Sequence, residues 1–138
     1  MPPIATLTTF LAIAIAPAAI ASPAHHHNKP QALQLKLKDS GRTVRLVPGQ
    51  ELRIRLYDCY DCGYVWHTQL APDTAVLTRL KQRQQRLGEC HARCAGGAAM
   101  TIFRYRAKAH GTTRLRLRYL PPGQQPAAKV FKLRVNVR

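Results

Sequence analysis

The chain ends in Phe131-Lys132-Leu133-Arg134-Val135-Asn136-Val137, and Arg114-Leu115-Arg116-Leu117-Arg118-Tyr119 and Phe103-Arg104-Tyr105-Arg106-Ala107-Lys108 precede it. All three runs alternate between apolar and polar residues. Because successive side chains of a β-strand point to opposite faces, this period of two predicts half-buried strands. His110-Gly111-Thr112 and the segment from Leu120 to Ala128 have the composition of connecting turns.

The same pattern extends toward the N-terminus. Residues 33–38, 42–47, 51–56 and 64–68 read as further strands, and Pro48-Gly49-Gln50 reads as a tight turn. About seven short strands with regular turns predict an all-β chain folded as a β-sandwich. The residues expected to face inward are Leu35, Leu37, Val44, Leu46, Leu52, Ile54, Trp66, Phe103, Tyr105, Leu115, Leu117, Phe131, Leu133 and Val135.

Residues 73–87 have no single interpretation. Val76, Leu77, Leu80 and Leu87 could line one face of a helix that Asp73 caps. The segment could equally be a strand followed by a polar excursion, and the sequence leaves both open.

The N-terminal residues indicate export. Residues 1–24 carry no charge, include an apolar run, and contain Ala19-Ile20-Ala21, which has the small-x-small form of a signal-peptidase site. We therefore expect a signal peptide over 1–21, a disordered linker with the run His25-His26-His27 over 22–32, and a folded domain over 33–138. The expected location is periplasmic or secreted, with no stable membrane insertion after cleavage.

The chain is strongly basic, with 22 Lys and Arg residues against 6 acids and a formal net charge of +16. Such a field attracts anionic partners, so an acidic protein surface is one candidate partner. The basic residues are dispersed along strands and no nucleic-acid-binding motif accompanies them, so we expect no nucleic-acid partner.

Four cysteines, Cys59, Cys62, Cys90 and Cys94, lie in two connections. In an exported protein they are disulfide candidates, and four cysteines allow three pairings that sequence cannot separate. Chain entropy favours bridges between the connections, which would contribute about 3 to 4 kcal/mol each against about 2 kcal/mol for a bridge within one connection. The alternative is a periplasmic metal-binding or other protein-binding module that uses these cysteines. Its metal site would be a four-sulfur zinc or copper site, in which His67 or His91 could replace one thiolate.

Enzymatic chemistry has little support. A redox Cys-x-x-Cys normally begins a helix, whereas Gly63-Tyr64-Val65-Trp66 continues as strand. The six carboxylates are scattered and no Ser/His/Asp arrangement is recognisable, so we expect no enzyme activity, no catalytic residue and no cofactor. Trp66 is expected in the core, while Tyr64 could face the core or the loop.

These features resemble the chagasin family, small secreted inhibitors of papain-like cysteine proteases. The resemblance spans roughly residues 33–138. It rests on Gly63-Tyr64-Val65-Trp66, on Gly96-Gly97 ahead of the aromatic strand, on Gly111-Thr112-Thr113, and on the terminal Phe-x-Leu-x-Val-x-Val pattern.

The resemblance implies an immunoglobulin-like sandwich that inserts three loops from one end into the active-site cleft of a papain-like protease. We expect the protein to be a monomer. The implied protease-binding loops are Cys59-Tyr60-Asp61-Cys62-Gly63-Tyr64, Cys94-Ala95-Gly96-Gly97 and Pro121-Pro122-Gly123. The family's first loop reads Asn-Pro-Thr-Thr-Gly-Tyr, so only Gly63 and Tyr64 match there. Its second loop begins with glycine where Cys94 stands, and its third carries Arg-Pro-Trp, of which only the proline is kept. In the family the first two loops are neighbours, which would allow a double loop-to-loop disulfide.

Overall fold

A computed structural model of the chain describes residues 28–59, 61–87, 97–123 and 126–138. The predicted signal peptide and most of the predicted linker lie outside these ranges. Within them, no helix is long and apolar enough to cross a membrane.

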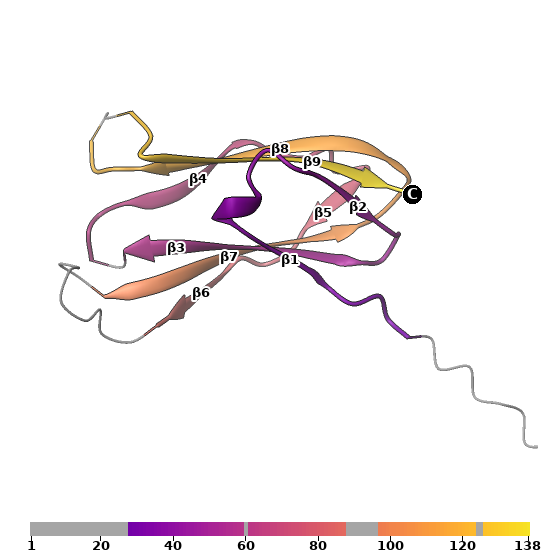
Figure 1. The fold of residues 1–138 in the computed structure, drawn as a ribbon, viewed down its shortest axis with the longest axis horizontal. Coiled ribbons are helices and arrows are strands. Elements are labelled where there is room, and N and C mark those ends of the chain that lie inside the picture. Colours follow the sequence, from indigo (N-terminus) through magenta and orange to yellow (C-terminus); the bar gives the residue numbers. More distant parts are fainter. Residues whose placement is uncertain (1–27, 60, 88–96, 124–125) are drawn as a thin grey trace, which may run out of the picture.

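The described residues form two facing β-sheets, as Figure 1 shows. The first sheet contains β1 (Leu33–Lys36), β3 (Glu51–Cys59), β7 (Ala98–Ala107), β5 (Leu77–Arg79) and β6 (Arg83–Arg86), where β5 and β6 both pair with β7. The second contains β2 (Thr43–Leu46), β9 (Lys129–Val137), β8 (Gly111–Leu120) and β4 (Val65–Leu70), in that order. The β1–β3 and β2–β9 pairs are parallel and the others antiparallel. The predicted all-β sandwich is confirmed.

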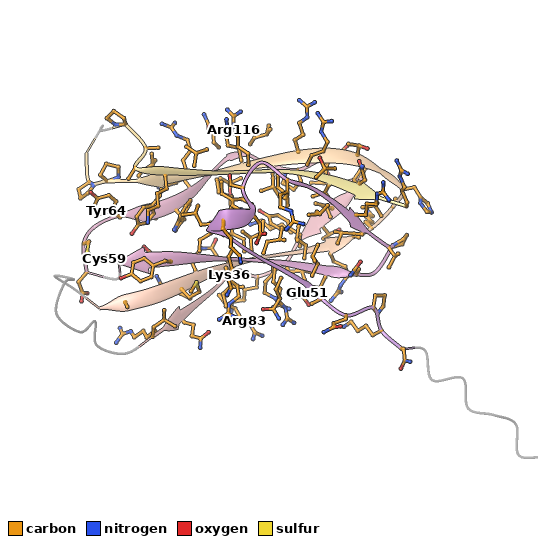
Figure 2. The ribbon with its side chains drawn as sticks, viewed as in Figure 1. Lys36, Glu51, Cys59, Tyr64, Arg83 and Arg116 are labelled. Atoms are coloured by element: carbon orange, nitrogen blue, oxygen red, sulfur yellow. A yellow bond between two sulfur atoms is a disulfide. The ribbon has the colours of Figure 1, made fainter. Side chains whose placement is uncertain are left out.

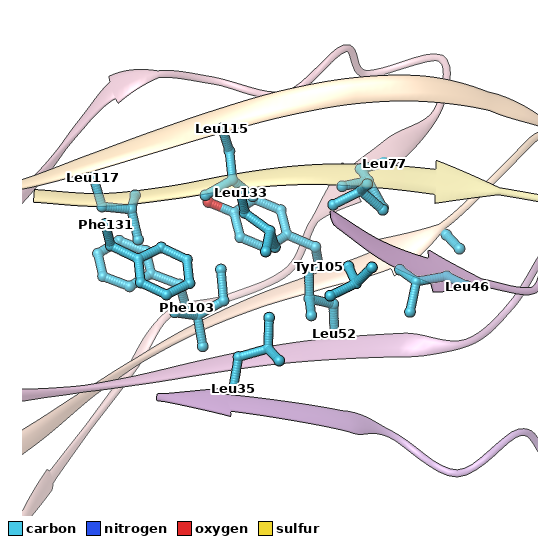
Figure 3. Close-up of a cluster of buried hydrophobic side chains, with 14 of the residues drawn as sticks. Leu35, Leu46, Leu52, Leu77, Phe103, Tyr105, Leu115, Leu117, Phe131 and Leu133 are labelled. Carbon is cyan, nitrogen blue, oxygen red and sulfur yellow. The ribbon is translucent and has the colours of Figure 1, made fainter. Parts of the chain in front are cut away.

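The core lies between the sheets, where Phe103 and Tyr105 of β7 face Leu115, Leu117 and Phe131 across the layer (Figure 3). Every residue predicted to face inward is buried except Leu37, which is partly buried. The prediction of a strand through Lys38 is wrong because the chain leaves β1 after Lys36 and enters the 3-10 turn η1 (Leu37–Asp39). In that turn the Lys36 N–H donates to Asp39 Oδ2 at 2.8 Å.

The ambiguous segment resolves as strand. Asp73 starts a turn and no helix follows it, because the Ala75 N–H donates to Asp73 Oδ1 at 2.8 Å and the Leu77 N–H donates to the Asp73 carbonyl at 2.9 Å. Strands β5 and β6 then follow, which raises the count in the described residues from the predicted seven or so to nine. Strand β3 is also longer than predicted and includes Cys59.

Candidate functional site

Three connections leave the sandwich at the same end. Cys59 at the end of β3 is directly opposite Ala98 at the start of β7, so the β3–β4 and β6–β7 connections are neighbours. Val65 at the start of β4 is opposite Leu120 at the end of β8, which brings the β8–β9 connection to the same end. We call this the loop end; it lies at the left of Figure 1.

The first connection is closed by a disulfide between Cys59 and Cys62, with a Cα–Cα separation of 5.3 Å. The Cys62 N–H also donates to the Cys59 carbonyl at 3.4 Å, as in a tight turn. The expected bridge from this connection to the second one is therefore wrong for Cys59 and Cys62. The entropy argument compared loop lengths alone, whereas the chain reverses so sharply after Cys59 that the nearest sulfur is three residues away.

The same disulfide rules out the alternative site in which Cys59 and Cys62 bind zinc or copper as thiolates, because both sulfurs are already bonded to each other. Cys90, Cys94 and His91 lie outside the described residues. Within the described ranges, no three His, Cys, Asp or Glu side chains are grouped closely enough to hold a metal ion.

Gly63 brings the first connection into contact with the third. Its φ is +73°, a conformation that favours glycine, and a Cβ atom at this position would lie 2.9 Å from Pro122 Cγ. Glycine therefore serves two purposes here: it permits the turn, and it lets the chain approach Pro122 closely.

Asp61 joins the first connection to the second. Its exposed side chain accepts a hydrogen bond through Oδ2 from the Gly97 N–H at 3.3 Å. The first connection is thus in contact with Gly97 at the end of the second connection and with Pro122 of the third.

A buried polar network anchors the loop end to the sandwich. Asp58 accepts hydrogen bonds from Tyr119 Oη (3.1 Å, at Oδ1) and from Thr101 Oγ1 and Gln84 Nε2 (2.9 and 3.2 Å, at Oδ2). The Tyr119 hydroxyl in turn accepts from the Cys59 N–H at 2.9 Å. Burial raises the pKa of Tyr119 to about 12, so its phenol keeps the proton that it donates to Asp58.

Three aromatic rings pack beside this network. Tyr119 stacks on Tyr64 and on Trp66, with ring centroids 5.1 and 4.8 Å apart. Trp66 is buried as predicted, and its Nε1–H donates to the Tyr57 carbonyl at 2.9 Å. Tyr64 is partly buried and packs against the core, so it contacts the loop and the core at once. The Tyr119–Asp58 and Trp66–Tyr57 hydrogen bonds each join one sheet to the other.

A family model described as "Chagasin family peptidase inhibitor I42" matches residues 45–135. The chain belongs to the chagasin family. No curated protein gives a significant match.

Solved structures of three similar proteins agree with this assignment of the fold. The cysteine protease inhibitor EhICP2 from Entamoeba histolytica is 18% identical, with a TM-score of 0.66 over 78% of this chain and 96% of its own. Amebosin is 21% identical, with a TM-score of 0.57 over 79% and 99% of the two chains. PbICP-C, solved in complex with falcipain-2, is 15% identical, with a TM-score of 0.54 over 78% and 92%. The chagasin-like sandwich is thereby confirmed, and the chain is an inhibitor-family protein, not an enzyme.

The structure brings together those predicted site residues of the chagasin-type loops that it describes. Asp61, Cys62, Gly63, Tyr64, Gly97, Pro121, Pro122 and Gly123 all lie at the loop end, next to Cys59. Tyr60, Cys90, Cys94, Ala95 and Gly96 fall outside the described residues.

The anchoring network was not predicted from the sequence. Asp58 continues the inward phase of Leu52, Ile54 and Leu56, and an acid at an inward position needs buried hydrogen-bond donors. Tyr119 similarly continues the phase of Leu115 and Leu117. The inward position of each residue in its alternating strand was the feature of the sequence that could have identified both residues as buried.

Proposed function

We propose that this protein is a secreted or periplasmic inhibitor of papain-like cysteine proteases, which blocks the active-site cleft with the three connections of the loop end. The observation that carries the proposal is their mutual contact: Gly63 lies against Pro122, and Asp61 binds Gly97. Membership of a family of peptidase inhibitors supports it, as does the complex of the similar protein PbICP-C with falcipain-2.

The geometry suits a steric mechanism. Asp61, Gly63 and Pro122 are exposed, whereas the residues beneath them, Asp58 and Tyr119, are buried and hydrogen-bonded. A surface held by a disulfide, a buried network and contacts between the connections loses little conformational entropy on binding, which favours tight association. No step of this mechanism needs a nucleophile or a cofactor.

The tight turn has a further consequence for a protease inhibitor. The disulfide fixes Cys59 to Cys62 and leaves Asp61 in the closed ring between them. Such a constrained peptide does not readily adopt the extended conformation that a protease needs for cleavage, so we expect the first connection to occupy the cleft without being cut.

The test is a titration of the oxidised, purified protein against papain, comparing Gly63→Ala with Gly49→Ala. Both glycines have positive φ (+73° and +84°), so both substitutions carry similar backbone strain, about 1 to 2 kcal/mol. Only Gly63 has a neighbour, Pro122, since nothing lies within 4 Å of a Cβ at Gly49. We expect Gly63→Ala to weaken inhibition at least tenfold and Gly49→Ala to leave it within about threefold.

Two results would contradict the proposal. One is no inhibition of papain or of any other papain-like protease by the wild-type protein at high micromolar concentration. The other is an equal loss of inhibition in both variants, because that would place the contact surface elsewhere. Export is tested separately by N-terminal sequencing of the protein from its native host, which should begin at Ser22.

A further inference from the structure

The outer face of the second sheet carries cations directly opposite one another. Arg114 of β8 pairs with Arg134 of β9, and Arg116 pairs with Lys132. Their neighbours in sequence, Leu115 and Leu133 among them, point into the core, so these four side chains project outward. We call Arg114, Arg116, Lys132 and Arg134 the basic quartet.

The quartet surrounds a surface depression of about 310 Å³, which Arg42 and Leu70 also line. Cross-strand neighbours are about 5 Å apart and alternate residues on one strand about 7 Å apart, so the quartet forms two short parallel rows of charge. Figure 2 shows Arg116 projecting from the side of the sandwich, away from Cys59 and Tyr64 at the loop end.

The quartet lacks acidic partners. In the part of the chain that the structure describes, no carboxylate forms an ion pair with any of its members; Asp39 pairs instead with Arg42, at 2.8 Å. Like charges directly opposite in a sheet destabilise it.

In the first sheet, a pair of opposed arginines has an acidic partner. Arg53 and Arg104 are also directly opposite, on β3 and β7, but Glu51 accepts hydrogen bonds from both, at 2.9 and 2.6 Å. One cross-strand arginine pair thus shares an internal carboxylate that offsets half of its charge, whereas among the described residues the two adjacent cationic pairs on the second sheet have no such carboxylate. With no counter-charge among the described residues, these four cations are available to solvent ions or to an anionic ligand.

We propose that the basic quartet binds a sulfated polysaccharide lying along β8 and β9. The two rows of cations match a linear chain that carries repeated anionic groups. The described residues of this face on β8 and β9 include no aromatic side chain on which bases of single-stranded nucleic acid could stack. Because β2 and β4 flank β9 and β8, these two strands cannot enter the major groove of a duplex as a two-stranded ribbon. The same face lacks the Trp and Phe side chains that bury themselves in a lipid interface.

The quartet lies in the middle of β8 and β9, and Figure 2 shows Arg116 on a different side of the molecule from Cys59 and Tyr64. The quartet and the loop end can therefore be occupied at once. A bound polysaccharide would hold the protein in an anionic matrix and leave the three connections free. This inference does not depend on the proposed inhibition.

The experiment uses the full-length exported protein and heparin as the probe, with affinity measured by calorimetry at 0.15 M NaCl. Arg116→Gln/Lys132→Gln removes two charges from the quartet. Arg83→Gln/Arg106→Gln is the matched control, because it removes two exposed charges from the first sheet. We expect at least a tenfold loss of heparin affinity in the quartet variant, less than a threefold loss in the control, and a shallower dependence on salt in the quartet variant only.

Folding is checked by the melting temperature, which should not fall in the quartet variant because like-charge repulsion is removed. Equal losses in both variants would overturn the proposal in favour of a net-charge effect. Two further probes are duplex DNA and vesicles of phosphatidylglycerol and phosphatidylcholine. The proposal would also be overturned if either probe bound as tightly as heparin and lost the same affinity in the quartet variant. Heparin should leave the inhibition of papain unchanged. The proposed inhibition and the proposed polysaccharide binding are therefore tested independently, and either can be wrong while the other is right.

Discussion

Removing the Tyr119 hydroxyl tests whether the buried network supports the loop end. In Tyr119→Phe the ring stays and keeps its stacking with Tyr64 and Trp66. Two hydrogen bonds are lost, one to Asp58 Oδ1 at 3.1 Å and one from the Cys59 N–H at 2.9 Å. Both partners are buried, so both are left without this bond away from water.

The expected cost follows from these two bonds. A hydrogen bond to a charged group contributes about 1.5 to 3 kcal/mol, and a buried donor left unpaired costs about 1 to 3 kcal/mol. Asp58 keeps its bonds from Thr101 and Gln84, which reduces the sum. We therefore expect the free energy of unfolding to fall by about 2 to 4 kcal/mol, and Tm to fall by roughly 8 to 16 °C at about 4 °C per kcal/mol.

The measurement is urea denaturation and calorimetry of the oxidised protein, with Tyr64→Phe as the control. Tyr64 belongs to the same stack, but its hydroxyl takes no part in the Asp58 network, so its loss should change the free energy of unfolding by less than about 0.5 kcal/mol. The reasoning is refuted if Tyr119→Phe lies within 0.5 kcal/mol of wild type, or if the two variants are equally destabilised.

Three further predictions concern charge and cross-linking. Hydrogen bonds from Arg104 and Arg53 lower the pKa of Glu51 from 4.5 to about 2. The stabilising effect of Glu51 is therefore complete above pH 4.5 and is lost as the pH falls toward 2. Over that window, the difference in the free energy of unfolding between wild type and Glu51→Gln should shrink by up to about 3 kcal/mol. Cys59→Ser/Cys62→Ser should lower the free energy of unfolding, measured by urea titration, by about 2 kcal/mol, which is the value for a short closed loop. A loss above about 4 kcal/mol would contradict this estimate, because the disulfide would then stabilise the folded state in addition to constraining the unfolded chain. If the +16 charge steers the protein to an acidic protease, raising NaCl to about 0.5 M should slow association in stopped-flow measurements and leave dissociation nearly unchanged, and an association rate independent of salt would contradict steering.

The sandwich was predictable because its long strands alternate between apolar and polar residues. Strict alternation in residues 114–119 and 131–137 leaves one face apolar, and burial of that face fixes both the sheets and the register. The prediction fails where backbone hydrogen bonds override the pattern. Leu37 has the inward phase, but Asp39 draws the chain into a 3-10 turn. Asp73 resembles a helix cap, but its side chain and carbonyl close a turn before a short strand.

The position of the loop end was predictable from the sequence, but its disulfide and the contacts between its connections were not. Gly63 and Tyr64 matched a family pattern, which indicated where the first connection would lie. The disulfide partner of Cys59 depends on how sharply the chain reverses after β3, and no periodicity encodes that reversal. The contact between Gly63 and Pro122 joins residues far apart in the sequence and depends on the β4–β8 register.

The network beneath the loop end explains how the first connection can differ so much from the family pattern while the fold is kept. The family's first loop and this one share only Gly63 and Tyr64, the residues that contact Pro122 and Tyr119. The Cys59–Cys62 disulfide begins directly after Asp58, whose own hydrogen bonds come from β6, β7 and β8 and not from the residues of the loop. Asp61 is then held by the ring on one side and by the Gly97 N–H on the other. If the loop end binds a protease as proposed, substitution at Asp61 should alter which protease is bound more than it alters the stability of the sandwich.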